Sequence, residues 1–254
     1  MVFVLLGGTD FTLAQVFVGP VAGGQYSWVA LADDGSRNLY RVKPVLGFNG
    51  GIAVHFRVRE RFSLHTSVLY STKGKRIAGK DDPLLDQEVT YHFIDMPLVY
   101  TVDFKGTTGS GKQFKYAFGI GPNVSYWLGG RGTLWNADFS ELTVPAQDYK
   151  IVFKQGVNDI AEDQMGVEDP NRIQLGLNVT AGLTLEPSPD QKFVVTLRYE
   201  FGHSYFSRTS NGVFLRTYYT DDLRSRNQGV RLSVAYLFDL NLEERKKGKS
   251  TIKH

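Results

Sequence analysis

Seven ionisable residues fall within stretches whose alternating pattern predicts β-strands. They are Arg57, Lys115, Arg198, Arg231, Asp95, Asp103 and Glu200. Five of them share a strand face made mostly of small and polar residues, whereas Asp95 and Asp103 share theirs with Tyr91, Phe93, Val99 and Thr101. If these faces are enclosed, the charges must pair, because charges removed from water are costly unless they are compensated. The sequence therefore predicts an interior charge network, although the same residue types would also suit a gated path for protons or ions.

The spacing of these charges suggests two groupings. Asp103 and Lys115 flank one short connection, so we expect them to pair across it. The remaining charges away from the strand ends are expected to form a network midway along the strands. That second group contains Asp95, Arg198, Glu200 and Arg231.

Histidine beside serine offers a second kind of chemistry, that of a general base and a nucleophile. His65 and Ser67 are two residues apart on a strand face of mostly small and polar residues, out of reach of a substrate at the apolar face. His203 lies on the apolar face, whereas its neighbour Ser204 lies on the opposite one. The pattern therefore predicts no catalytic residue. No His or carboxylate spacing fits a metal site, so we expect neither a metal nor a cofactor.

The alternation also predicts the elements that must hold these groups. In residues 114–128 nearly every second residue is apolar, and those between are mostly small or polar. A period of two indicates a β-strand with two different environments. Eight such strands are predicted, at 16–29, 45–58, 62–71, 91–104, 114–128, 173–185, 193–205 and 230–238. Pro122 lacks a backbone donor, so we expect a bulge or kink there.

The composition narrows the class of protein. The chain has 254 residues with a mean hydropathy of −0.22, and it contains no apolar run long enough for a transmembrane helix. The absence of Cys excludes disulfides and thiolate metal sites. The net charge of +3 is spread along the chain, which does not indicate a nucleic-acid partner.

The connections between the predicted strands alternate in length. Those at 58–62, 105–113 and 186–192 are short, and those at 30–43, 72–89, 129–171 and 206–229 are long. An even number of strands, each near the ~9–11 residues that cross a bilayer, with short turns at one end, is typical of outer-membrane barrels. The predicted fold is all-β, an eight-stranded antiparallel up-and-down transmembrane β-barrel. We expect it in the bacterial outer membrane, with both termini periplasmic and the long loops extracellular.

The two faces of the strands predict which side meets lipid. Large aliphatic and aromatic side chains recur on one face of every strand, and small side chains suit the crowded interior of a narrow barrel. A soluble lipocalin-like barrel, with the opposite orientation, is the alternative. Aromatic residues near the strand ends are predicted to anchor the barrel at the membrane interfaces. They are Tyr26, Trp28, Tyr70, Tyr126, Trp127, Tyr199, Tyr205, Tyr236 and Phe238.

The chain divides into three predicted parts. Residues 1–14 resemble part of a signal peptide, residues 15–238 form the barrel, and residues 239–254 form a basic periplasmic tail. The long connection at 129–171 is rich in Asp and Glu, and within it the alternating segment 143–155 is expected to extend the strands as a hairpin.

Several phrases resemble the PorT-like outer-membrane β-barrel family of Bacteroidetes-type bacteria. The strongest is "LGFNGGIAVHFRVRERFSLHTSVLYSTKGKR" at 46–76, followed by "YHFIDMPLV" at 91–99 and "LRYEFGHS" at 197–204. The resemblance implies an eight-stranded barrel of the general size of the OmpA membrane domain or OmpX. Some members of that family serve type IX secretion, so the resemblance does not imply a single function.

The sequence favours a non-enzymatic structural or accessory role. The partners expected are outer-membrane lipid and a protein of a surface or secretion complex, which would contact the outer loops or the tail. A small porin-like pore is the alternative, and a lipid-A modifying enzyme is a weaker one.

Overall fold

The computed structural model describes residues 15–82, 84–107, 113–136, 146–153, 160–209, 211–215 and 217–240. The signal-peptide prediction for residues 1–14 lies outside these residues, as do residues 241–254 of the predicted tail. Among the described residues, no helix combines the length and apolar character needed to span a membrane.

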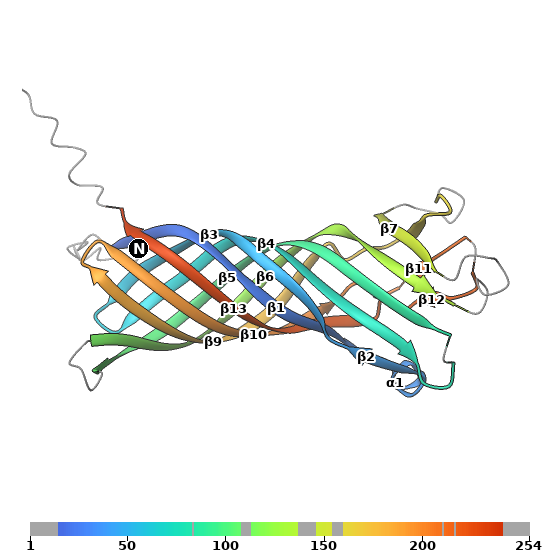
Figure 1. Cartoon of the computed structure of the whole chain (residues 1–254), viewed down its shortest axis with the longest axis horizontal. Coiled ribbons are helices and arrows are strands. Elements are labelled where there is room, and N and C mark those ends of the chain that lie inside the picture. The colour runs from blue at the N-terminus through green and yellow to red at the C-terminus, as the bar shows by residue number, and fades with distance from the viewer. Residues whose placement is uncertain are drawn as a thin grey trace, which may run out of the picture.

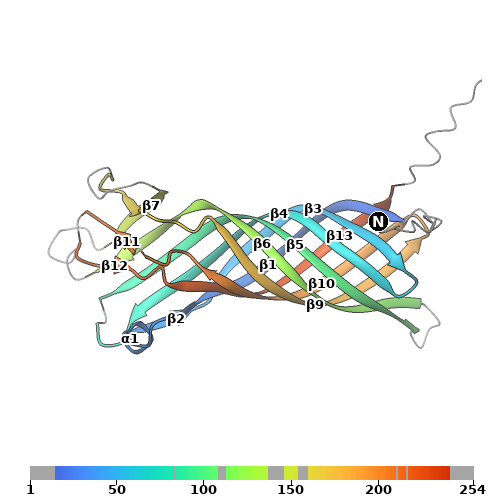
Figure 2. The same cartoon turned by 180° about the vertical axis from the view of Figure 1, so that it is seen from behind.

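Eight long strands pair edge to edge until the sheet closes on itself (Figure 1). They are β1 (Val16–Leu31), β3 (Val45–Arg59), β4 (Phe62–Gly79), β5 (Asp86–Thr107), β6 (Gln113–Trp135), β9 (Ile173–Ser188), β10 (Gln191–Tyr205) and β13 (Ser225–Asp239). Each is antiparallel to both neighbours, and β1 pairs with β3 and with β13, which completes the ring. Viewed from behind, the ring continues through β5, β6 and β9 (Figure 2). Each of the eight predicted ranges lies within one of these strands.

The ring is apolar outside, and polar side chains predominate in the middle of its interior. On β3, Leu46 and Ile52 are more than half exposed, whereas Asn49 on the opposite face is buried. The same division runs through β6, where Phe118 and Ile120 are exposed and Ser125 is buried. This is the reverse of a lipocalin-like barrel, because exposing large apolar side chains to water is unfavourable by about 25 cal/mol per Å².

Three adjacent strands are much longer than predicted. β4, β5 and β6 contain 18, 22 and 23 residues, so the loop predicted at 72–89 is wrong for 72–79 and 86–89. Their far ends pair with short strands at the end of the ring where the long connections lie. β2 (Tyr40–Lys43) pairs with β4, and β7 (Gln147–Phe153) pairs with β6 and with β8 (Gln164–Val167). The β7 strand corresponds to the predicted strand extension within 143–155.

We call this projection the head. It consists of the far ends of β4, β5 and β6 together with β2, β7, β8, β11 (Gly212–Val213), β12 (Thr220–Asp221) and the short helix α1 (Asp34–Leu39). The side chain of Asp33 caps α1 by accepting a hydrogen bond from the Ser36 amide at 3.0 Å. The opposite end, where β3 turns into β4 through Glu60 and Arg61, is called the short-turn end.

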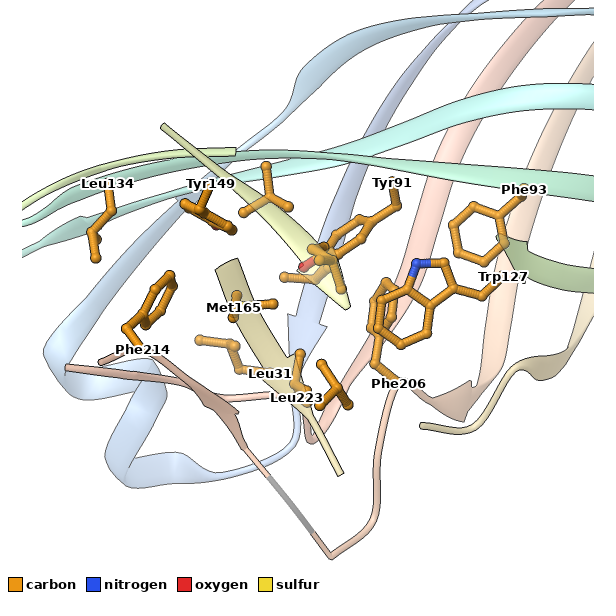
Figure 3. Packing of buried hydrophobic residues seen from close by; sticks show 14 of the residues in the cluster. Leu31, Tyr91, Phe93, Trp127, Leu134, Tyr149, Met165, Phe206, Phe214 and Leu223 are labelled. Atoms are coloured by element: carbon orange, nitrogen blue, oxygen red, sulfur yellow. The ribbon is translucent and has the colours of Figure 1, made fainter. Parts of the chain in front are cut away.

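A hydrophobic cluster fills the inside of the head (Figure 3). We call it the head cluster, and it consists of Val29, Leu31, Leu85, Val89, Tyr91, Phe93, Trp127, Leu134, Tyr149, Ile151, Met165, Val167, Phe206, Phe214 and Leu223. The Phe206 ring lies 4.5 Å from that of Tyr91 and 5.0 Å from that of Trp127, between ring centres. The prediction of Trp127 as a membrane anchor is therefore wrong, because this side chain shares the inward face of β6 with Ser125.

The bulge expected at Pro122 is absent. The pairing of β5 with β6 keeps one register on both sides of Pro122, and the ladder skips the proline and Gly121. The proline therefore interrupts the ladder locally without shifting its register. The register between β5 and β6 shifts instead at Leu128 of β6, between the pairs Phe93–Trp127 and His92–Gly129. Gly129 has φ +148°, a conformation that favours glycine.

Candidate functional site: the charged interior and the ends of the ring

Asp95 on β5 lies at the centre of the interior charges and is fully buried. Its Oδ1 lies 3.0 Å from Lys73 Nζ, and its Oδ2 lies 2.6 Å from Arg231 Nη2. The hydroxyls of Ser71 and Ser125 donate hydrogen bonds to the same carboxylate at 2.6 and 2.5 Å. Two cations and two hydroxyl donors thus compensate a charge that has lost its water.

Glu200 on β10 completes the arrangement. Its Oε1 lies 2.6 Å from Lys73 Nζ, and its Oε2 lies 3.7 Å from Arg231 Nη2. Asn123 also donates to Oε1, at 3.2 Å. Lys73, Asp95, Glu200 and Arg231, which we call the interior network, therefore join β4, β5, β10 and β13 across the inside of the ring.

The interior network differs from the predicted one in two members. Arg198 forms no hydrogen bond or ion pair with the described residues, and its Nε is buried without a partner. Lys73 takes the central place instead. Sequence reasoning missed Lys73 because it ended the strand at Ser71, although one more step of the same alternation would have placed Lys73 on the inward face.

The pair predicted between Asp103 and Lys115 is wrong. Lys115 Nζ lies 2.7 Å from Glu186 Oε1, and Asp103 accepts a hydrogen bond from Ser63 Oγ at 2.7 Å. The register explains the difference. Asp103 is paired with Ala117 on β6, so Lys115 lies beyond Asp103 along the strand and instead meets the side chains of β9.

A second buried ion pair lies within the head. Lys75 Nζ and Asp221 Oδ1 are 2.5 Å apart, and both side chains are fully buried. Burial raises the pKa of Asp221 above its ordinary value, and Lys75 acts in the opposite direction. We call this contact the head ion pair, which joins β12 to β4. Both residues fall in segments that sequence reasoning assigned to loops.

The histidine and serine candidates are not arranged as base and nucleophile. The His65 ring stacks on His55 with centres 3.7 Å apart, and its Nε2 lies 3.2 Å from Thr101 Oγ1. His203 is exposed, whereas Ser204 Oγ accepts the amide hydrogen of Leu175 at 2.9 Å. The described part of the chain contains no group of three potential metal ligands.

The predicted interface aromatics lie on the outer surface, toward the two ends of the ring. Tyr236 and Phe238 are near the short-turn end, with ring centres 4.8 Å apart, and Tyr236 donates a hydrogen bond to Gln191. The others lie toward the head, and these are Tyr26, Trp28, Tyr70, Tyr126, Tyr199 and Tyr205. Arg172 lies over the Tyr126 ring at 4.7 Å from its centre. Aromatic side chains at two levels are typical of membrane barrels.

A closed ring of strands with an apolar outside, a polar inside and aromatic residues toward both ends defines the class of membrane-embedded β-barrels. The chain belongs to the family described as "Outer membrane protein beta-barrel domain", which matches residues 14–207. Membership of this family indicates that the protein resides in the outer membrane.

Solved structures similar to this chain include the following three. Neisserial surface protein A is 12% identical over 88% of this chain and 96% of its own, with a TM-score of 0.39. Ail of Yersinia pestis is 13% identical over 88% and 99%, with a TM-score of 0.34. OprG from Pseudomonas aeruginosa is 10% identical over 89% and 96%, with a TM-score of 0.46. No curated protein sequence matches this chain.

Proposed function

We propose that this chain is a non-enzymatic, eight-stranded outer-membrane barrel that is closed to ion flow and presents its head to a protein partner. The observation that carries the proposal is the filling of the ring at two successive levels. The interior network occupies the middle, and the head cluster occupies the end beyond it. An eight-stranded ring has room only for its own side chains, which supports a structural rather than a conducting role.

The dimensions of the head support a role outside the membrane. A tilted strand crosses the bilayer with ~9–11 residues, so about half of the 22 residues of β5 extend beyond lipid. The head also carries exposed apolar side chains, including Leu39, Leu84 and Tyr218. Exposed apolar side chains on a projecting surface favour contact with another protein.

The proposed orientation places the head outside the cell and the short-turn end in the periplasm. The phrase at 46–76 resembles the PorT-like family, so we propose a surface or secretion complex as the source of the partner. A cysteine placed at Gly35 in α1 should react with a membrane-impermeant reagent on intact cells. A cysteine in place of Glu60 should react only after the outer membrane is opened.

Conductance tests the closed interior directly. Purified protein in planar bilayers should give no steady ion steps, because charged and hydrophobic side chains fill the ring. Steady steps from the wild-type protein that change with Arg231→Ala would contradict the proposal and favour the pore.

Site-specific crosslinking tests the partner. A photoreactive residue at Leu39 or Tyr218 should give the same protein adduct in native membranes. The matched control is a photoreactive residue at Ile52, which faces lipid and should give no such adduct. If both head positions give only the uncrosslinked chain, the head has no stable protein partner. Unchanged lipid-A mass on expression is expected, and a mass change abolished by His65→Ala would instead identify an enzyme.

A further inference from the structure

A cavity of about 440 Å³ opens at the short-turn end. Five basic and three acidic side chains line it, and we call it the vestibule. Its inner wall includes Phe17, whose ring centre lies 3.5 Å from Lys192 Nζ. The volume is within the range that small ligands or headgroups occupy.

The positive charges of the vestibule are only partly neutralised. Glu186 is shared by Lys115 at 2.7 Å and Lys192 at 3.8 Å. The three other basic residues, Arg57, Arg61 and Lys105, are exposed and form no ion pair with the residues that the structure describes. A concave surface with an excess of one sign of charge concentrates ions of the opposite sign.

The lining of the vestibule also crosses the rim of the ring. His55 and Ser63 lie on the inward face of their strands, whereas Phe104 and Tyr116 belong to the outward apolar face. The rings of Phe104 and Tyr116 stack with their centres 5.3 Å apart. An occupant of the vestibule therefore meets basic groups on one side and lipid-facing aromatic surface on the other.

We infer that the vestibule binds the phosphate of a phospholipid from the leaflet at the short-turn end. Arg57, Arg61 and Lys105 supply the positive charge for the phosphate, and Phe104 and Tyr116 supply apolar surface for the start of an acyl chain. The phosphate chemistry alone would also suit a free phosphate ester, but only an amphiphile uses both sides of the rim. The inference rests on the membrane placement proposed above.

Native mass spectrometry of the full chain tests this inference, with phosphatidylglycerol added to the detergent-solubilised protein. Each basic residue near an anionic lipid surface strengthens binding roughly fivefold. The double variant Arg57→Gln/Arg61→Gln should therefore weaken retention of the lipid by about 10- to 30-fold. The matched control is Arg41→Gln/Lys43→Gln, which removes two exposed basic residues of β2 in the head and should leave retention unchanged.

Two further additions separate the sources of the phosphate. Glycerol 3-phosphate, which carries the headgroup without acyl chains, should bind much more weakly than phosphatidylglycerol. Equal binding of the two would overturn the lipid source in favour of a soluble phosphate ester. Equal retention of phosphatidylglycerol by the wild type and by Arg57→Gln/Arg61→Gln would overturn the vestibule as the binding site. Heat-modifiable gel mobility and insertion into vesicles are measured on the same samples. Loss of both would contradict the membrane placement itself, separately from the lipid site.

Discussion

Replacing Asp95 by asparagine is expected to lower the free energy of unfolding by about 3–5 kcal/mol, the usual cost of removing one partner from a buried ion pair. The substitution keeps the shape of the side chain but removes its charge. Lys73 and Arg231 would then share the single carboxylate of Glu200 in an interior from which they cannot reach water.

The geometry agrees with a cost in this range. Asp95 faces two cations at 3.0 and 2.6 Å, and each contact contributes roughly 6 kcal/mol at an effective dielectric constant of about 20, before the cost of desolvation. Removal of the charges from water costs several kcal/mol per ion, which leaves a net effect of a few kcal/mol.

Urea unfolding in lipid vesicles, followed by gel mobility, measures the change. Lys73→Met added to Asp95→Asn removes the excess positive charge and should recover about half of the loss, because Arg231 keeps Glu200 at 3.7 Å. The matched control is Asp34→Asn, which breaks a largely exposed pair with Arg37 and should cost less than about 1 kcal/mol. An Asp95→Asn cost no larger than that of Asp34→Asn, or a purely additive double variant, would refute the reasoning.

Three further predictions follow from the head and from the glycines. Lys75→Met leaves Asp221 buried without its cation. Because burial already raises the pKa of Asp221, the variant should be least stable at neutral pH and should regain stability as the pH falls through that pKa. Hydrogen exchange of the head measures this change. A pH-independent loss would contradict this. Gly129→Ala should lower the free energy of unfolding by about 1–3 kcal/mol, because Gly129 has φ +148°. In the same unfolding assay Gly182→Ala should be nearly neutral, because a Cβ added at Gly182 lies 3.7 Å from its nearest atom. A variant with Trp127 as its only tryptophan should resist quenching by brominated lipid, because Trp127 is fully buried; strong quenching would place it on the outer surface.

The eight strands of the ring could be predicted because their signal is local. Side chains along a strand alternate between two faces whatever lies beside it. Lipid requires one apolar face throughout the span, so the outward residues are mostly apolar in each of the eight ranges. The outward position of Ile52 and the inward position of Ser125 follow from that alternation alone.

The head could not be predicted because its pattern reverses. On β5 the inward face is polar at Asp95 and Thr101 but apolar at Val89, Tyr91 and Phe93. Outside lipid a strand buries its apolar side chains inward, as in any water-soluble domain. The change of environment therefore interrupts the alternation in polarity without interrupting the strand, and the sequence predicts a loop at 86–89, where β5 has already begun.

The sequence by itself determined the eight strands of the ring, the face that their side chains occupy and therefore the membrane environment. Only the tertiary structure decided that Lys73, rather than Arg198, meets Asp95, and that Lys115 meets Glu186 rather than Asp103. Alternation specifies the face that a side chain occupies but not its position along the axis of the ring. That position depends on the stagger between neighbouring strands all the way around the ring, and the stagger is set by the pairing of residues far apart in the chain.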